Sequence, residues 1–282
     1  MVRLLDRGVL VRQRVSFYRQ LTTVPVLAAS CAIHAGALAA VLARPRAWAW
    51  ALAAVLANHA FLTAAGLWPR SRVLGPNLIR LPQASEARGE VAITIDDGPD
   101  PDVTPRVLAQ LEAYGAVATF FCIGECVERY PDLAREIVRR GHRIENHSQR
   151  HRHTFSLLGP RAMRSEIARA QQSIQRITGT QPRFFRAPAG LRNPFLDPVL
   201  RDLQLQLASW TRRGFDTVTG DADIVYRRLA KALHAGDILL LHDGHAARAA
   251  GAAPVVLDVL PRLLETLRTH RLTPVTLRTA LQ

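Results

Sequence analysis

The chain has 282 residues, long enough for one large domain with a sizeable core and an appended segment. Lys and Arg number 37 against 23 Asp and Glu, for a formal net charge of +14, but the arginines are scattered and aromatic residues make up only 6%, which argues against a nucleic-acid-binding surface. Three cysteines are too few for a disulfide framework. Cys122 and Cys126 can pair or remain two buried thiols, and their spacing does not define the compartment.

Two uncharged stretches, residues 21–43 and 47–68, are each just over 20 residues long. A helix of that length crosses about 30 Å of hydrocarbon. Joined by Arg44-Pro45-Arg46, they predict a transmembrane hairpin within a membrane anchor over residues 1–72. A buried hairpin of a soluble protein is the alternative, and a cleaved signal peptide fits less well because the second apolar stretch follows at once.

Polar and aromatic residues within these stretches support the membrane interpretation. His34, Asn58 and His59 lie well inside them, so we expect their side chains to face the partner helix and to form hydrogen bonds there. Tryptophans lie near the ends of the second stretch, as in the aromatic belts of membrane proteins: Trp48, Trp50 and Trp68.

The flanking arginines predict the orientation of the hairpin. Five arginines precede the first stretch and three follow the second within residues 70–80, whereas the connecting loop holds two. The positive-inside rule then places both termini and the downstream domain in the cytoplasm, at the inner membrane of the cell. A periplasmic or extracellular domain is the alternative, because a translocated domain can override local charge bias.

After a predicted linker over residues 73–89, short apolar runs alternate with amphipathic segments through a domain spanning residues 90–282. This alternation is typical of repeated βα units, and it predicts an α/β fold with a distorted barrel of seven to eight strands. Strands are predicted at 91–95, 118–123, 143–146, 183–186, 205–210, 237–242 and 273–277. Helices are predicted near 103–114, 131–140, 160–177, 194–203, 221–235 and 254–270.

The first strand of this domain ends in two adjacent carboxylates, Asp96 and Asp97, followed by a Gly98-Pro99 turn. The carboxyl end of a strand is where α/β folds place their chemistry. Two neighbouring acids in an interior site stay ionised only near a cation or strong hydrogen-bond donors. An acidic turn without function is the alternative for this stretch taken alone.

A histidine cluster begins where the third strand should end. His147 and His151 are four residues apart, which places both imidazoles on one side of a helical turn, and one carboxylate would complete a site for a divalent metal. His153 is a competing ligand. A solvated turn is the alternative for this cluster taken alone.

These residues carry a resemblance to the NodB-type polysaccharide deacetylases, carbohydrate esterase family 4. The stretch Thr94–Pro99 resembles the first motif, and His147–His151 the second. Arg186–Gly190 is similar to the third motif and Leu240–His242 to the fifth, while the fourth corresponds most loosely, to Trp210–Asp216. The motifs occur in family order over roughly residues 88–280.

The resemblance implies a distorted barrel that hydrolyses N-acyl groups of amino sugars. Asp97, His147 and His151 would bind the metal, commonly zinc. Asp96 would be the general base that deprotonates the attacking water, and Arg186 would pair with Asp96 and hold it.

The resemblance also implies a proton donor for the leaving amine. His242 would be this acid, and Asp216 would orient and charge it. Amide hydrolysis also needs a stabilised oxyanion, for which the backbone N–H of Ala189 is our candidate donor.

Two positions depart from the family pattern. Ala189 stands where the family often has an aromatic residue, so a sugar contact is lost or supplied elsewhere. The fourth motif lacks the usual Asp-Trp pair, which leaves Asp221 and Asp223 as rivals of Asp216. Other interpretations concern neighbouring residues: a substrate phosphate can be bound by Arg212 and Arg213, and turn positions are expected for Asp243 and His245.

The sequence therefore predicts a membrane-anchored, zinc-dependent hydrolase that removes an N-acyl group, most simply N-acetyl, from an amino sugar. A cytoplasmic domain favours a lipid-linked saccharide or glycolipid as substrate, and basic residues favour anionic lipid. An outward-facing domain favours peptidoglycan or another polysaccharide. Removal of a formyl group and a non-catalytic saccharide-binding module are the alternatives, and the sequence leaves the oligomeric state open.

Overall fold

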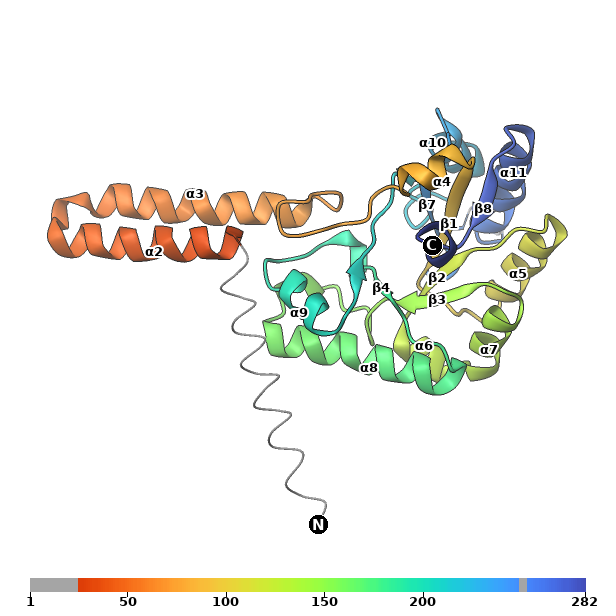
Figure 1. Cartoon of the computed structure of the whole chain (residues 1–282), viewed down its shortest axis with the longest axis horizontal. Helices are drawn as coiled ribbons and strands as arrows, with labels where there is room; N and C mark the ends of the chain where they lie inside the picture. Colours follow the sequence, from red (N-terminus) through yellow and green to blue (C-terminus); the bar gives the residue numbers. More distant parts are fainter. Residues whose placement is uncertain (1–24, 249–252) are drawn as a thin grey trace, which may run out of the picture.

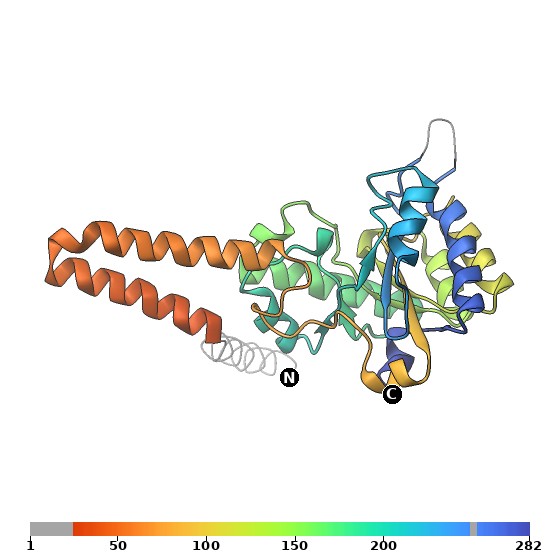
Figure 2. The ribbon, with the colours of Figure 1, turned by 90° about the horizontal axis from the view of Figure 1, so that it is seen from above.

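The computed structural model describes residues 25–248 and 253–282, which form a helical hairpin and an α/β domain (Figure 1). The hairpin consists of α2 (Pro25–Ala43) and α3 (Trp48–Leu67), joined by the short helix η1 (Pro45–Ala47). It projects away from the domain in both views (Figures 1 and 2). The predicted start of the first apolar helix, residues 21–24, and the arginine-rich residues before it lie outside the described residues.

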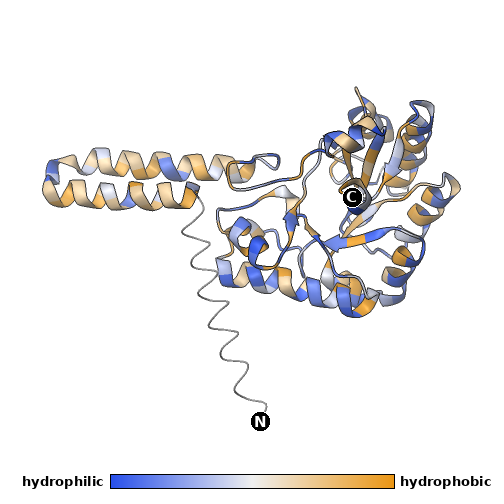
Figure 3. Cartoon of the chain, in the orientation of Figure 1, coloured by the Kyte–Doolittle hydropathy of each residue, from blue (hydrophilic) through white to orange (hydrophobic). Residues whose placement is uncertain are grey.

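Both hairpin helices are long and apolar enough to cross a membrane, by length and composition, and few of their residues are buried. Apolar side chains therefore cover most of the hairpin (Figure 3). Polar groups meet between the helices: Asn58 Nδ2 donates to Ser30 Oγ at 2.8 Å, and Nε2 of His34 lies 3.2 Å from Nε2 of His59. This confirms that the polar residues of the apolar stretches face the partner helix.

The domain is built on one parallel sheet. Its strands run in the order β5-β4-β3-β2-β1-β7-β6, with β8 paired to the first residues of β1. The predicted strands are confirmed in position, and β6 is an additional one. The bounds are β1 (Glu90–Asp96), β2 (Thr119–Cys122), β3 (Arg143–Asn146), β4 (Phe184–Phe185), β5 (Gln206–Leu207), β6 (Arg212–Arg213), β7 (Ile238–His242) and β8 (Thr273–Val275).

Helices cover the outer face of this sheet (Figures 1 and 2). The six predicted helices are present, and α6 is one that the hydrophobic pattern did not predict. The main helices are α5 (Thr104–Ala113), α6 (Gly124–Arg129), α7 (Pro131–Arg139), α8 (Pro160–Thr178), α9 (Leu196–Asp202), α10 (Ala222–Ala230) and α11 (Val256–Thr269). Short helices are α4 (Gln83–Ala87), η2 (Phe155–Leu157), η3 (Pro188–Gly190) and α12 (Leu277–Ala280).

The expected distorted barrel is confirmed as a curled, open sheet. The edge strands β5 and β6 do not pair with each other. Residues of the predicted linker 73–89 lie beside this opening: Leu78 exchanges backbone hydrogen bonds with residues 207 and 209, and the Leu81 N–H donates to Gly236 O just before β7. Leu74 and Leu81 are buried, so this segment packs onto the domain.

Alternation along β1 directs its acid into the barrel. Val91, Ile93 and Ile95 belong to the apolar cluster under the outer helices, whereas Ala92 belongs to the cluster inside the barrel. Successive side chains of a strand point to opposite faces, so Asp96 points inward like Ala92. The strand therefore places a carboxylate at the mouth of the barrel while burying its apolar residues behind it.

Candidate active site

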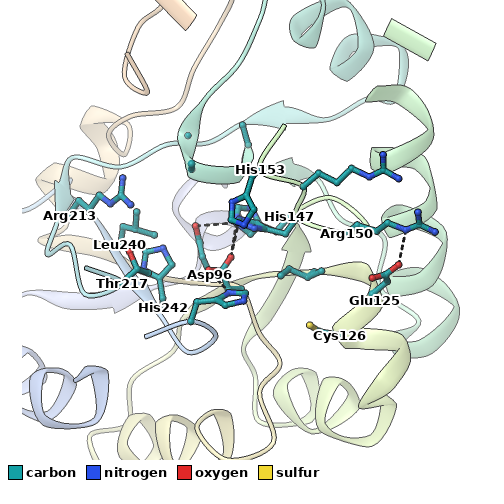
Figure 4. Close-up of a pocket in the computed structure, with 18 of the residues that line it drawn as sticks. Asp96, Glu125, Cys126, His147, Arg150, His153, Arg213, Thr217, Leu240 and His242 are labelled. Atoms are coloured by element: carbon teal, nitrogen blue, oxygen red, sulfur yellow. Dashed lines mark hydrogen bonds and ion pairs between the residues drawn. The ribbon is translucent and has the colours of Figure 1, made fainter. Parts of the chain in front are cut away.

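A cavity of about 640 Å³ opens at the carboxyl ends of the strands (Figure 4). Asp96 is the last residue of β1 and His242 the last of β7. His147 directly follows β3. The sheet thus brings together side chains far apart in the sequence. All seven of the side chains predicted to act, together with Ala189, lie in or directly behind the cavity wall: Asp96, Asp97, His147, His151, Arg186, Asp216 and His242.

Asp97, His147 and His151 form a three-residue cluster. One potential ligand atom from each lies within 4.8 Å of the other two. Oδ1 of Asp97 lies 3.2 Å from Nε2 of His147 and 3.3 Å from Nε2 of His151, yet this buried oxygen has no hydrogen-bond partner. A buried carboxylate oxygen without a partner is costly unless something else binds it. One carboxylate and two imidazoles are a donor set that suits zinc, and the cluster therefore fits a divalent cation.

The two histidines are electrically suited to this cluster. His147 Nδ1 lies 2.8 Å from Arg186 O, a carbonyl that can only accept, so Nδ1 carries the proton and Nε2 presents its lone pair. Burial lowers the pKa of His151 to about 4, assisted by the neighbouring His147, and keeps its ring neutral near pH 7. Burial alone would raise the pKa of Asp97, but hydrogen bonds from His147 and His245 outweigh it and hold this pKa well below its usual range.

Arg186 lies beneath the cavity floor and pairs with Asp96. Its Nη1 donates to Asp96 Oδ1 at 2.7 Å and to Thr94 Oγ1 at 2.8 Å. The remaining guanidinium protons reach the carbonyls of Ala208 and Ser209, and the plane lies 4.1 Å from the Phe121 ring centroid. Burial lowers the pKa of Arg186, and the charge of Asp96 opposes that effect. The guanidinium thus holds one orientation and supplies the counter-charge for Asp96.

Asp216 holds His242 at two points. Its Oδ1 lies 2.8 Å from Nδ1 of His242, and its Oδ2 accepts the His242 backbone N–H at 2.7 Å. Burial lowers the pKa of His242, but the charge and hydrogen bond of Asp216, with Asp96 and Asp97, outweigh it and raise this pKa to about 9. The rivals of Asp216 lie elsewhere: Asp221 caps α10, and Asp223 pairs with Arg262.

The loops around the cavity hold left-handed backbone conformations. Ala189 has φ of 54° within the short helix η3 and lies on the cavity wall. Of nine non-glycine residues with positive φ, six belong to loops at this site: Asp97, Ser148, His151, Ala189, Phe215 and His245. Such conformations cost of order 1–3 kcal/mol each and persist where the surrounding structure enforces them. The fold therefore spends stability on the shape of this site.

Two residues expected only to form a turn contact the Asp96–Gly98 segment. Nδ1 of His245 lies 3.2 Å from Oδ2 of Asp97, and the buried carboxylate of Asp243 accepts from Thr104 Oγ1 at 2.5 Å. Gly98 packs so closely on Asp243 that a side chain there would collide with the carboxylate. Their position directly after the motif ending in His242 is the only sequence signal that identifies them.

The other open alternatives are also resolved in geometry. His153 lines the cavity but is not part of the three-residue cluster. Arg213 lines the cavity between the rings of Trp210 and Phe215, whereas Arg212 pairs with Asp237 away from it. The cysteines at 122 and 126 are free thiols, and burial raises the pKa of both.

The sequence model of the polysaccharide deacetylase family matches residues 83–208. A peptidoglycan-N-acetylglucosamine deacetylase of Bacillus cereus is 34% identical over 175 residues, which cover 61% of this chain and 81% of the relative. A chitooligosaccharide deacetylase of Azorhizobium caulinodans is 32% identical over 161 residues, covering 57% of this chain and 76% of the relative.

Solved structures agree with these sequence relatives. A family 4 carbohydrate esterase from Streptomyces lividans, in complex with acetate, matches with a TM-score of 0.59 at 32% identity, over 66% of this chain and 91% of that chain. A family 4 pseudoenzyme from Bacillus anthracis matches with a TM-score of 0.65 at 22% identity, over 75% of this chain and 71% of that chain, which shows the fold alone. The chain belongs to the polysaccharide deacetylase family, carbohydrate esterase family 4.

Proposed function

We propose that this protein is a membrane-anchored, zinc-dependent hydrolase that removes the N-acetyl group from an amino sugar of a lipid-linked saccharide or glycolipid. One observation carries the chemistry: a three-residue cluster fit for a metal, a paired carboxylate and a paired imidazole line the same cavity. The named activities of the relatives, on peptidoglycan N-acetylglucosamine and chitooligosaccharide, support the N-acetyl amino sugar as the reacting unit.

Asp97, His147 and His151 hold the divalent cation in this proposal. When bound, such a cation lowers the pKa of water from about 15.7 toward about 7 and polarises an acyl oxygen. The Nδ1–H···O bond from His147 to the Arg186 carbonyl fixes the ring that presents its lone pair to the site. His151 remains neutral because it is buried, so neither imidazole must lose a proton at neutral pH to become a ligand.

Asp96 is the general base in this proposal. Its Oδ1 is bound by Arg186, while Oδ2 lies 3.8 Å from Nε2 of His147 and so borders the metal cluster. A carboxylate that is buried beside Asp97 needs the guanidinium to remain ionised and ready to accept a proton. The hydrogen bond from Thr94 to the Leu239 carbonyl orders the hydroxyl that shares the Arg186 donor.

His242 is the general acid, on the opposite strand of the mouth. Its raised pKa, about 9, keeps the imidazole protonated at neutral pH, and Asp216 directs Nδ1 inward so that Nε2 is free to donate to a leaving amine. Ala189 contributes a backbone N–H to the oxyanion. Removal of one such donor typically costs about 3 kcal/mol of transition-state stabilisation.

The charge around the cavity supports an anionic, membrane-bound substrate. Arginines with open guanidinium faces line the cavity: Arg129 and Arg213 form no ion pair within residues 25–248 and 253–282. A phosphate between sugar and lipid is the complement of such cations. The hairpin and the positive-inside count of the sequence together place the cavity at the cytoplasmic leaflet, where polymeric wall material is absent.

The test is hydrolysis by the full-length protein in detergent, with zinc content measured in parallel. Released acetate and formate are quantified from an N-acetylated chitooligosaccharide and from an N-acetylglucosamine linked through phosphate to a long isoprenoid chain. We expect acetate, with higher kcat/KM on the lipid-linked substrate, and losses of at least about 100-fold in Asp96→Asn and His242→Ala. Full activity in either variant refutes the mechanism, and formate in place of acetate refutes the acyl assignment.

A further inference from the structure

We propose that the cavity between the helical hairpin and the domain binds the hydrocarbon chain of the lipid-linked substrate, so that its sugar reaches the catalytic cavity from the membrane. The inference rests on the proposed membrane anchoring and deacetylation. The cavity has a volume of about 630 Å³. One wall comes from α2 and α3, and the other comes from the domain loops at residues 156–157 and 192–195.

The shape and lining of this junction cavity suit an alkyl chain. Its accessible lining is predominantly apolar, with leucines from both hairpin helices and Pro194 and Phe195 from the domain. From Leu67 back to His59 it follows α3 over about 12 Å, at 1.5 Å per residue. Because both helices are apolar on their outer surfaces, the cavity opens between segments that contact hydrocarbon, and a chain can enter from the bilayer without crossing water.

The charge of the junction cavity suits the phosphate at the head of such a chain. Among its lining residues there is no carboxylate within the described chain, whereas Arg192 lines its domain end. Arg192 is only 4% exposed, its Nε has no hydrogen-bond partner, and it makes no ion pair among residues 25–248 and 253–282. A buried guanidinium with an unpartnered N–H is expensive unless an anion approaches it.

One segment connects the junction cavity to the catalytic cavity. Residues 187–190 line the catalytic cavity and residues 192–195 line the junction cavity. The chain leaving α3 packs on the same wall: Ser209 Oγ donates to Pro69 O at 2.8 Å, and Gly190 lies so close to Pro69 that a side chain there would collide with it. The two cavities therefore share a wall, and the end of the hairpin holds it.

Gly66 fixes the junction itself. The Arg192 N–H donates to Gly66 O at 3.1 Å, and a Cβ on Gly66 would collide with the Arg192 carbonyl. Exposed apolar side chains surround this contact, namely Leu67, Trp68 and Leu157, the last from the domain itself. Large exposed apolar residues beside a membrane-spanning hairpin indicate that this side of the domain rests on the lipid surface.

The first experiment fills the junction cavity in the full-length protein held in lipid nanodiscs. Thr63→Trp and Cys31→Trp place an indole in the cavity, whereas Ala64→Trp and Ala32→Trp add the same group at the next, exposed residue outside it. The readout is the ratio of kcat/KM for the isoprenoid-phosphate substrate to that for the soluble chitooligosaccharide. We expect this ratio to fall at least tenfold in the cavity variants and to stay within twofold in the controls. Equal ratios in all four variants overturn the proposal.

The second experiment does not depend on catalysis. An isoprenoid phosphate with a diazirine at the end of its chain is photolysed with the full-length protein, and the labelled peptides are mapped by mass spectrometry. We expect labels within residues 27–34 and 59–67, reduced in Thr63→Trp but not in Ala64→Trp. Labelling elsewhere, or displacement by an equal amount of phosphatidylglycerol, overturns the proposal. If the unsubstituted protein releases no acyl group yet labels as expected, the deacetylation fails and the lipid site stands.

Discussion

Asp216 binds both the ring and the backbone of His242, with Oδ1 2.8 Å from Nδ1 and Oδ2 accepting the backbone N–H at 2.7 Å. The two residues are 26 positions apart in the sequence, and the carboxylate is fully buried. A two-point contact fixes the side chain and main chain of the histidine together. The imidazole therefore has one orientation toward the cavity, and the carboxylate determines its protonation.

Asp216→Asn should shift the alkaline limb of the pH profile toward lower pH. His242 acts as an acid only while protonated, so activity falls as the pH rises through its pKa of about 9. An amide removes the negative charge that raises this pKa, which then moves toward the ordinary value near 6.5. A cation bound by Asp97 also lowers the pKa of His242, so the prediction concerns the direction of the shift.

The measurement is kcat/KM between pH 5.5 and about 9.5 for both proteins in the zinc-loaded form. Asp221→Asn is the matched control, because Asp221 caps α10 outside the cavity. A loss of equal size at every pH in Asp216→Asn would show that the carboxylate acts on position alone and would contradict the prediction.

Arg186→Met should strongly destabilise the domain. The substitution leaves Asp96 buried without its counter-charge and removes donors to two backbone carbonyls. Breaking a buried ion pair by removing one partner typically costs about 3–5 kcal/mol. Arg139→Met is the control, since its pair with Glu136 is largely exposed and should change the free energy of unfolding by less than about 1 kcal/mol. Denaturation of the full-length protein in mild detergent compares them, and similar small losses would contradict the prediction.

The sequence predicts most of the strands because their residues are β-branched or aromatic and apolar on both faces, as β1 shows. The strand β6 escapes prediction because it is two arginines, Arg212 and Arg213, whose pairing with β7 depends on the sheet and not on their propensity. The helix α6 is only six residues long, too short for a helical period to stand out. Elements that depend on tertiary contacts are therefore the ones that the pattern misses.

The site shows the same division. Asp96, Asp97, His147 and His151 follow strands at motif positions, so their meeting can be predicted from the parallel sheet and the family motifs. The choice of Asp216 over its neighbours Asp221 and Asp223 depends on the path of a loop, which local sequence does not specify. The contact between His245 and Asp97 likewise requires a left-handed residue, φ 57°, in the loop after β7.

His147→Ala should abolish stoichiometric zinc binding, whereas His153→Ala should retain it. Both histidines line the cavity, but only His147 belongs to the cluster with Asp97 and His151. Zinc per protein is measured by elemental analysis after dialysis of the full-length protein. Equal zinc contents in the two variants would show that the ligand set is wrong.

His245→Ala should weaken zinc binding without abolishing it. Its Nδ1 lies 3.2 Å from the Asp97 oxygen that faces away from the two cluster histidines, a position from which it orients the carboxylate. Loss of such an outer hydrogen bond typically costs 10–100-fold in metal affinity, about 1.4–2.8 kcal/mol. Competition with a fluorescent chelator measures the dissociation constant. An affinity as high as that of His153→Ala would contradict the orienting role.

A reporter fused after Gln282 should lie in the cytoplasm. The arginine count favours this orientation, because eight arginines flank the outer ends of the two apolar stretches and two lie in the connecting loop. We expect a green fluorescent protein fusion at this end to fluoresce and an alkaline phosphatase fusion to be inactive, with the reverse for a phosphatase inserted after Arg46. An active phosphatase after Gln282 would place the cavity outside the cytoplasm. The lipid-linked substrate would then lose its main support, and an exported or wall polysaccharide would become the better candidate, while the catalytic roles of Asp96 and His242 would stand unchanged.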